Sequence, residues 1–180
     1  HWEYKSVFGD MILQALAEYL PQRIPAGHQL STCSSIIGGK RADGEYWLAV
    51  EPQLGGWGAT AYADGQLGQH PLGNGETYNI PMEVMETRYP IRMERYEFDT
   101  GHSAGAGKHR GGFGVIKEDR VLDPAGGHVT ATLGRHFRAP WGVDGGNDGS
   151  PNRIEVVPAG EETPAISTGT LARYPLKQGD

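Results

Sequence analysis

The sequence predicts an α+β fold, with predominantly short β-strands joined by glycine-rich loops and one N-terminal amphipathic helix. Three observations predict it: one stretch of helical periodicity near the start, a series of short apolar runs after Pro25, and 28 glycines with 12 prolines among 180 residues. The glycines have no fixed period, which favours many tight turns over a collagen-like repeat. We expect a single segment, with a helix and its connection in residues 1–27 and a β-rich region in residues 28–180.

The helical stretch is residues 6–20, "SVFGDMILQALAEYL". Its apolar residues recur at spacings of three and four and would form one broad face: Val7, Phe8, Met11, Ile12, Ala15, Leu16, Tyr19 and Leu20. Ser6 is a candidate N-cap, and Pro21 is expected to end the helix. The pattern predicts a helix that packs this face on a sheet.

Short apolar runs separated by turn residues predict six to nine strands in the rest of the chain. The runs are residues 45–52, 91–98, 113–122, 128–137 and 153–160. Residues 79–89, "NIPMEVMETRY", are expected to form a short helix or a loop with one helical turn.

Composition excludes some classes of protein. The net charge is −6, and no basic stripe with interleaved aromatic residues is present, so nucleic acid is not an expected partner. No run approaches the length of a membrane span. Cys33 is the only cysteine, which rules out an internal disulfide and suits a reducing compartment, so we expect a cytoplasmic protein. Cys33 has no visible His/Asp relay that would make it a nucleophile.

The stretch "GAGKHRGGFG", residues 105–114, suggests a phosphate-binding loop but does not match one. A P-loop needs glycine where His102 stands and serine or threonine where His109 stands, and a dinucleotide fingerprint needs glycine in place of Arg110. Backbone amides in this loop, beside Lys108 and Arg110, could form an anion-binding nest. The alternative is a glycine-rich connection between strands with solvated cations.

Two carboxylates in the segment 73–90 form the second candidate group. Glu83 and Glu86 are three residues apart, so a helical turn would place both on one face, where paired carboxylates suit acid–base chemistry or metal binding. The alternative is a surface turn that Asn79 caps and in which a carboxylate pairs with Arg88.

Other candidate motifs are weaker. The seven histidines show none of the spacings typical of metal sites. "GHSAG", residues 101–105, matches a nucleophile elbow in its letters, but that motif needs a helix after the serine. The glycine-rich sequence that follows cannot start a helix, so we reject the elbow.

Five blocks in this order resemble the C-terminal third of the hydantoinase B/5-oxoprolinase family, which includes large subunits of ATP-dependent acetone and acetophenone carboxylases. The blocks are "GGWGATAYADG" (55–65), "NIPMEVMETRYP" (79–90), "RMERYEF" (92–98), "GAGKHRGG" (105–112) and "FRAPWGVDGGNDGSPN" (137–152). "PQRIPAG" (21–27) also matches, so the resemblance runs almost from end to end.

The resemblance implies that this chain is the C-terminal part of a B-type subunit in a hetero-oligomeric complex. A hydantoinase A-type partner would bind ATP and phosphorylate the substrate carbonyl. The B-type chain would then help to hydrolyse a cyclic amide of the hydantoin or 5-oxoproline type. One alternative is an ATP-dependent carboxylase of acetone or acetophenone type, and another is a non-catalytic scaffold segment for subunit assembly.

The resemblance also implies roles for residues and cofactors. Candidate catalytic residues are Asn79, Glu83, Glu86 and Arg110, and candidate substrate-binding residues are Gly105, Gly107 and Lys108. A divalent metal, Zn²⁺ or Mn²⁺, is expected to be held upstream of this segment, by the remaining part of the B-type chain. The chain differs from many relatives at His102 and Ser103, which leaves the small-molecule substrate open.

Overall fold

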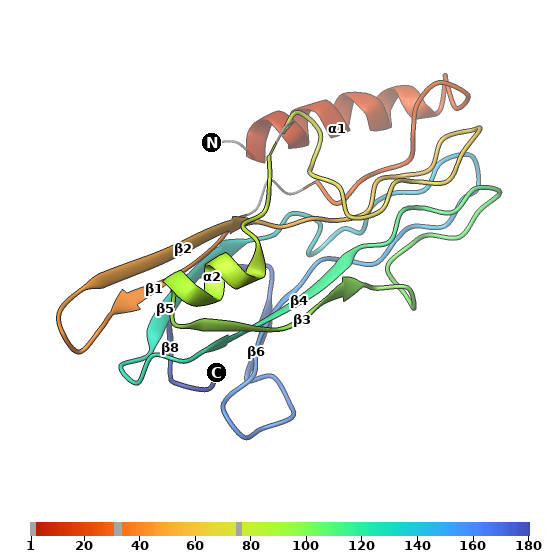
Figure 1. Cartoon of the computed structure of the whole chain (residues 1–180). Coiled ribbons are helices and arrows are strands. Elements are labelled where there is room, and N and C mark those ends of the chain that lie inside the picture. The colour runs from red at the N-terminus through yellow and green to blue at the C-terminus, as the bar shows by residue number, and fades with distance from the viewer. Residues whose placement is uncertain (1–2, 31–33, 75–76) are drawn as a thin grey trace.

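The computed structural model describes residues 3–30, 34–74 and 77–180, so Cys33 lies outside the described residues. Two helices and eight strands make up the elements of this part of the chain (Figure 1). In chain order they are α1 (Glu3–Ala17), β1 (Ser34–Lys40), β2 (Tyr46–Pro52), α2 (Met82–Arg88), β3 (Ile91–Phe98), β4 (Val115–Val121), β5 (Gly127–Thr132), β6 (Ile154–Val156), β7 (Ile166–Thr168) and β8 (Thr170–Leu176). The predicted α+β class is confirmed.

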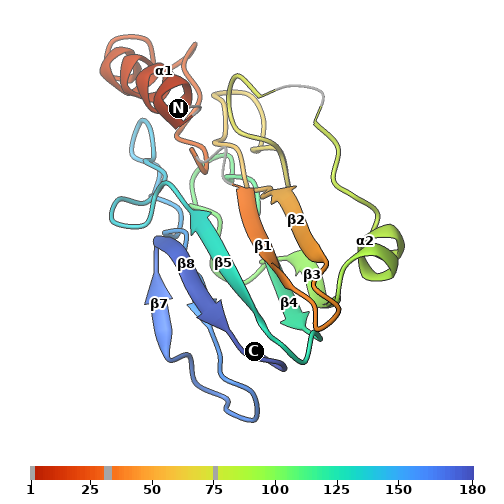
Figure 2. The ribbon, with the colours of Figure 1, turned by 90° about the vertical axis from the view of Figure 1, so that its left-hand side faces the viewer.

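Antiparallel pairing organises the strands into one sheet and two smaller ribbons. The sheet has the order β2-β1-β5-β8 and faces the viewer in Figure 2, while β3 pairs with β4 and β6 pairs with β7. All five predicted runs contain a strand, and the predicted turn of helix at 79–89 is α2. The sequence patterns missed β1, β7 and β8.

Strand β1, which lies between β2 and β5 in the sheet, was missed because its "SSIIGGK" sequence contains two glycines. These glycines make room for the neighbouring strand β2. A Cβ atom on Gly38 would lie 2.7 Å from the Trp47 backbone oxygen, and one on Gly39 would lie 3.1 Å from the Trp47 indole nitrogen. The indole nitrogen donates a hydrogen bond to buried Asp123 at 3.0 Å. The two glycines therefore leave the space in which the large Trp47 side chain is buried.

The core is divided between two small clusters on the inner face of the sheet. One contains Val129, Ala131, Val156 and Leu171, and the other contains Trp47, Ala49 and Ile91. Strand β2 alternates strictly, so that Trp47, Ala49 and Glu51 point inward while Tyr46, Leu48 and Val50 are exposed.

Helix α1 does not pack as predicted. Its broad apolar face is exposed, with Phe8 at 67% and Met11 at 61% of their accessible surface, whereas the buried residues are Ser6, Asp10 and Ala17. Ser6 is also not the N-cap, because the helix begins at Glu3 and the Ser6 hydroxyl donates a hydrogen bond to the Leu72 carbonyl at 3.1 Å. The buried polar residues of this helix meet polar groups of the loops beneath it, so the small polar face turns inward.

The loops under α1 contact one another backbone to backbone. These segments, which we call the glycine layer, are residues 26–29, 55–69, 103–114 and 140–150, and they extend away from the strands in Figure 1. A Cβ atom at Gly112 would lie 1.9 Å from the Gln66 carbonyl oxygen, and one at Gly56 would lie 2.0 Å from the Gly112 oxygen. Such distances are impossible for a side chain, so glycine is required here by packing.

Hydrogen bonds between backbones connect the segments of the glycine layer. Gly27 donates to Trp141, Gly65 donates to Arg110 and Gly112 donates to Trp57, each with a donor–acceptor distance of 2.8 Å. These bonds satisfy buried amides outside any regular sheet. The glycine layer is therefore an ordered structure with its own hydrogen-bond pattern.

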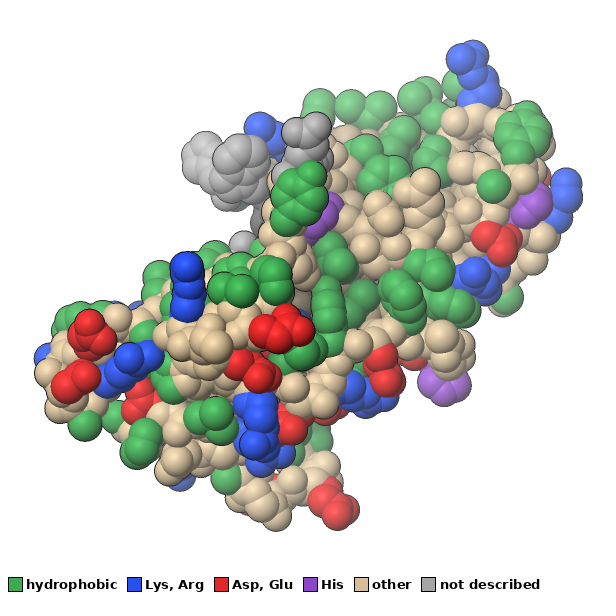
Figure 3. Space-filling view, viewed as in Figure 1, with side chains coloured by type: hydrophobic (Ala, Val, Ile, Leu, Met, Phe, Trp, Pro, Cys, Tyr) green, Lys and Arg blue, Asp and Glu red, His purple; other side chains and the backbone are tan. Residues whose placement is uncertain are grey.

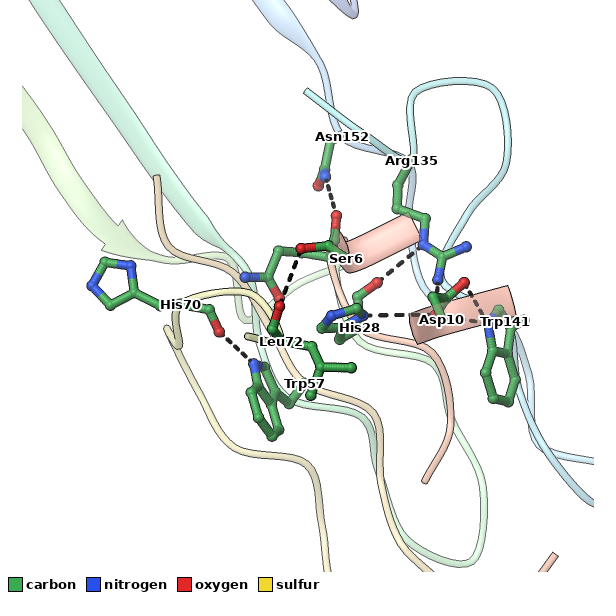
Figure 4. A network of polar contacts seen from close by, with 10 residues as sticks. Ser6, Asp10, His28, Trp57, His70, Leu72, Arg135, Trp141 and Asn152 are labelled. Carbon is green, nitrogen blue, oxygen red and sulfur yellow. Dashed lines mark hydrogen bonds and ion pairs between the residues drawn. The ribbon is translucent and has the colours of Figure 1, made fainter. Parts of the chain in front are cut away.

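A buried ion pair ties α1 to the glycine layer. Asp10 accepts hydrogen bonds from the Arg135 guanidinium at 2.6 Å and from the Trp141 indole at 3.1 Å, and the His28 ring lies 3.7 Å away (Figure 4). Burial disfavours the charge on Asp10, but His28, Arg135 and Trp141 outweigh burial and hold the pKa of this carboxyl below its ordinary value. Arg135 also donates to the His28 carbonyl at 3.0 Å, so one cation connects three segments.

We expect Gly112→Ala to lower the free energy of unfolding by about 2–4 kcal/mol, because its methyl group would collide with the Gln66 carbonyl. Gly111→Ala is the matched control, since a Cβ atom there would have its nearest neighbour at 3.4 Å. Urea unfolding of both variants measures the difference. Equal destabilisation by the two variants would contradict the packing requirement.

We expect Asp10→Asn to destabilise the chain by about 2–3 kcal/mol at about pH 7, because it leaves Arg135 buried without its anion. The pKa of Asp10 is lowered in the folded state, so its charge stabilises the fold above the ordinary value of 3.8 and this contribution is lost as the pH falls below it. The difference in unfolding free energy between wild type and variant, measured with urea, should therefore shrink as the pH falls below 3.8 and through the lowered pKa of the folded state. Glu18→Gln, an exposed carboxylate beyond the same helix, is the control, and a gap between wild type and Asp10→Asn that stayed constant with pH would oppose this account.

Candidate functional site

A groove of about 820 Å³ separates the inner face of the sheet from the β3–β4 ribbon and the glycine layer. Its apolar wall comes from the sheet and β6, through Ile37, Val129, Ala131 and Val156. Its polar wall comes from β3, β4 and the two loops of residues 103–114 and 140–153. A groove with one apolar wall and a few convergent charged groups is the usual form of a small-molecule site.

Three of the predicted site residues, Gly105, Gly107 and Lys108, line this groove. Their loop is fixed in position by glycine: a Cβ atom on Gly105 would lie 2.2 Å from the Asn147 carbonyl oxygen. The loop also closes on itself, since the Gly111 amide donates to the Gly105 carbonyl at 3.0 Å. Lys108 is exposed and lies among the groove-lining residues of this fixed loop.

Arg110 belongs to the same loop but is held against the protein. Its guanidinium lies 4.0 Å from the centre of the Phe113 ring and 3.7 Å from the Asp64 carboxylate, and it donates to the Gly111 carbonyl at 2.6 Å. The Arg110 backbone amide also donates to Asp64 at 2.9 Å. Arg110 is not among the residues that line the groove. These contacts connect the loop to the segment 55–69.

Asn79, Glu83 and Glu86 lie at α2, apart from the groove-lining residues. The Asn79 side chain donates to the Tyr96 hydroxyl at 2.8 Å, and Glu86 accepts a hydrogen bond from the Met93 amide at 2.9 Å. Glu83 is exposed in the first turn. The fold therefore connects this block to β3 and does not bring it together with Gly105, Gly107 and Lys108.

Asn79 does not cap α2 as the sequence suggested. The residue at the N-cap is Pro81, which has no side chain that could accept a hydrogen bond. The Asn79 carbonyl oxygen Oδ1 is buried and has no hydrogen-bond partner among the described residues. Buried polar groups are normally hydrogen-bonded, so an unpaired acceptor here is unusual.

The sequence patterns did not single out the charged wall of the groove. Strands β3 and β4 supply Glu94, Arg95, Glu118 and Arg120 to it, and Glu94 accepts hydrogen bonds from Arg92 and Arg120, both at 2.6 Å. These two arginines, as hydrogen-bond donors, lower the pKa of Glu94. The run at residues 91–98 predicted a strand, but pairing across the ribbon depends on the register with β4, which the pattern does not contain.

A buried charge cluster lies behind this wall. The Lys117 ammonium contacts the carboxylates of Glu51, on β2, and Asp119, the latter at 2.9 Å. Burial alone would lower the pKa of Lys117, but Asp119 and Glu51 raise it above its ordinary value. The cluster therefore connects the β3–β4 ribbon to the sheet through charge.

The structure also bears on the nucleophile elbow and on metal ligands. Ser103 is held by the loop, because its hydroxyl accepts a hydrogen bond from the Gly114 amide at 2.9 Å and donates one to the Asp99 carbonyl. No helix follows it among residues 101–114, which agrees with the rejection of a nucleophile elbow. Across the described ranges, no three His, Cys, Asp or Glu side chains are placed to hold a metal ion, and the sequence analysis expected the metal ligands upstream of this segment.

Neither α1 nor α2, the helices of the described residues, has the length and hydrophobicity needed to cross a membrane.

Comparison with known proteins finds relatives among hydantoinases and 5-oxoprolinases. A 5-oxoprolinase of Saccharomyces cerevisiae is 37% identical over 70 residues, which are 38% of this chain and 5% of that protein. A protein of Pseudomonas sp. strain NS671, named as the B-type component of a D-/L-hydantoinase, is 34% identical over 147 residues, which are 82% of this chain and 24% of that protein.

A solved structure also matches. The nucleotide-free structure of acetone carboxylase, from work on the mechanism of ATP-dependent acetone carboxylation, has a TM-score of 0.62 and 25% identity, and the match covers 75% of this chain and 18% of that chain. The chain thus spans about a quarter or less of the length of these relatives.

The sequence model of the hydantoinase B/oxoprolinase family matches residues 1–180. This chain therefore belongs to the hydantoinase B/oxoprolinase family.

Proposed function

We propose that this chain is part of the B-type subunit of an ATP-dependent cyclic amide hydrolase that acts on a hydantoin or 5-oxoproline type of substrate. The observation that carries the proposal is the family match over all 180 residues, together with a groove lined by the predicted loop residues Gly105, Gly107 and Lys108. An A-type partner would phosphorylate the substrate carbonyl before the B-type chain acts.

The chemistry of this reaction calls for a cationic group beside the substrate. An amide carbonyl is a poor electrophile, and conversion of its oxygen to a phosphate ester supplies a leaving group that water can displace. The phosphorylated substrate is an anion, and the groove-lining Lys108 would supply a cationic group to bind it, whereas Arg95 and Arg120 are paired with carboxylates. The rigid glycine backbone would hold Lys108 at a constant distance from the substrate.

The remaining cofactors belong to other polypeptide in this proposal. ATP would be bound by the A-type partner, and Zn²⁺ or Mn²⁺ by the part of the B-type chain outside this segment. A bound metal would position and activate water. The residues described here would bind and orient the anionic substrate.

A carboxylase of acetone or acetophenone type is the second candidate. The structural match to acetone carboxylase favours it, and the same groove would bind a phosphorylated enol, which is also an anion. The scaffold alternative is supported by Arg110 and Glu86, whose contacts connect segments of the protein. Catalytic roles for Asn79, Glu83, Glu86 and Arg110 stay predictions.

Substrate class is tested with the assembled complex of B-type and A-type polypeptides. We expect hydantoin or 5-oxoproline to stimulate ATP hydrolysis at least about tenfold and to be opened in proportion, while acetone with bicarbonate does not. Phosphate release and product formation are measured in parallel. Stimulation by the ketone and bicarbonate alone would favour the carboxylase, and stimulation by none of these would contradict both.

Site residues are tested in the same complex. We expect Lys108→Ala to lower kcat/KM by about 10–100-fold, because the groove loses a cation for the phosphorylated substrate. His102→Ala, an exposed residue of the same loop that does not line the groove, is the control and should keep wild-type kinetics.

A measurement of complex assembly distinguishes the scaffold alternative from a role in catalysis. Asn79→Ala, Glu83→Ala and Arg110→Ala join the set, with sedimentation of the complex measured beside turnover. The segment is a scaffold if these variants and Lys108→Ala reduce the amount of complex that assembles, while the variant complexes that do assemble turn over at the wild-type rate.

A further inference from the structure

Gln29 places a buried amide side chain in the wall of the groove. The residue keeps 5% of its accessible surface and is one of the groove-lining residues, together with Gly55, Gly56 and Asn152. Its backbone is held from both sides, because its amide donates to the Gly56 carbonyl at 3.2 Å and its carbonyl accepts a hydrogen bond from the Asn152 side chain at 3.1 Å. The Gln29 side chain therefore starts from a fixed point of the glycine layer.

The side-chain amide of Gln29 has one possible orientation. Its nitrogen Nε2 donates a hydrogen bond to the Gln69 backbone carbonyl at 2.8 Å. Since a carbonyl oxygen can only accept, the amide must turn its nitrogen toward Gln69 and leave its oxygen Oε1 on the other side. Oε1 is buried and has no hydrogen-bond partner among the described residues. This part of the groove wall thus holds an acceptor whose direction is fixed.

Glycine at position 55 gives the Gln29 side chain its space. A Cβ atom on Gly55 would lie 2.5 Å from Cγ and 3.0 Å from Cδ of Gln29. Gly55 also pairs with Gln69, through backbone hydrogen bonds of 3.0 Å and 2.6 Å. One backbone pair therefore both receives the Gln29 nitrogen and leaves room for its side chain, which holds the amide in one position.

The charged side chains of the groove wall already have partners. On the β3–β4 ribbon, Glu94 contacts Arg120 at 2.6 Å and Arg95 contacts Glu118 at 3.2 Å. Figure 3 shows acidic and basic side chains intermingled over this part of the surface. Asp119 also has a buried oxygen that is unpaired within the described part of the chain, but the other oxygen of this carboxylate is in an ion pair. Gln29 differs from these groups because it offers an uncharged acceptor, which suits an uncharged N–H donor.

We propose that Gln29 is a specificity-determining residue, whose Oε1 accepts a hydrogen bond from the ring N–H of a cyclic amide bound in the groove. This inference rests on the proposed function. A hydantoin or 5-oxoproline ring carries an N–H beside the carbonyl that is phosphorylated, whereas acetone, acetophenone and their enol phosphates have none. A buried acceptor that is left without a donor is costly, so Gln29 favours the cyclic amide over the ketone.

The same contact acts after phosphorylation. When the amide oxygen attacks the γ-phosphorus of ATP and ADP leaves, the ring nitrogen keeps its hydrogen and shares a positive charge with the adjacent carbon. Loss of that proton would return electron density to the carbon and make it a weaker electrophile. The N–H of this cation is a stronger donor than that of the neutral amide, so Gln29 keeps the proton on nitrogen while water attacks the carbon.

The test compares substrates with and without the ring N–H, in the assembled complex of A-type and B-type polypeptides. Each cyclic amide, hydantoin and 5-oxoproline, is compared with its N-methylated counterpart, and both methyl isomers of hydantoin are used because it has two N–H groups. We expect methylation to lower kcat/KM of the wild type at least about 100-fold. In Gln29→Met this ratio should fall at least about tenfold, because the side chain keeps its length but loses the acceptor.

Two further variants make the ratio decisive. Gln178→Met is the matched control, since this exposed glutamine does not line the groove and its Nε2 donates to the Leu122 carbonyl at 3.1 Å. Loss of that bond should leave the ratio unchanged. Gln29→Asn keeps an amide but withdraws it by one methylene group, so it should also lower the ratio, and it replaces Gln29→Met if circular dichroism shows that the latter does not fold.

The possible outcomes separate this proposal from the proposed function. Gln29 variants that slow both substrates equally, with the ratio kept, would overturn the proposal and leave Gln29 as a structural link to Gln69. A wild-type complex that opens the N-methylated rings as fast as the parent rings would overturn it as well. In both cases the cyclic amide hydrolase would stand. A wild-type complex that opens neither hydantoin nor 5-oxoproline would refute the proposed function, and the role of Gln29 with it.

Discussion

Close backbone contact between glycine-bearing segments is the constraint on which the arrangement of this protein depends. Gly56, Gly65, Gly105 and Gly112 each occupy positions where a Cβ atom would come within about 2.2 Å of a neighbouring carbonyl oxygen. The glycine layer that results carries Lys108 at the groove, and its outer side forms the seat of α1. Within the segment 105–114, packing therefore requires glycine at Gly105 and Gly112.

Polar contacts decide how α1 lies on this layer. Asp10, Arg135 and Trp141 form a buried group that joins a helix to a loop more than a hundred residues away in sequence. An unpaired charge in that place would be costly, so the helix is fixed with Asp10 inward. The apolar face opposite Asp10 is left exposed.

The residues of the family motifs lie in two separate places, the groove and the region of α2. Gly105, Gly107 and Lys108 line the groove, whereas Asn79 and Glu86 are bonded to β3. The β3–β4 ribbon lies between the two places and carries charged residues on its groove side. The two groups of motif residues therefore occupy separate places in the fold.

The sequence by itself determined the α+β class, the helix near the start, five of the strands and the helical turn at 79–89. Each of these follows from local periodicity and turn chemistry, which act within about ten residues. The order of the motifs also identified the family. These features can be predicted without knowing which distant segments come into contact.

Only the tertiary structure decided which face of α1 is buried, which glycines are packed and which motifs share a groove. An apolar stripe ordinarily points inward, and the rule failed at α1 because Asp10 meets Arg135 only after the chain has folded. Strand β1 was hidden for the same reason, since its glycines are explained by Trp47 of the next strand. Burial and pairing are properties of contacts between distant segments, and a pattern of neighbours along the chain does not contain them.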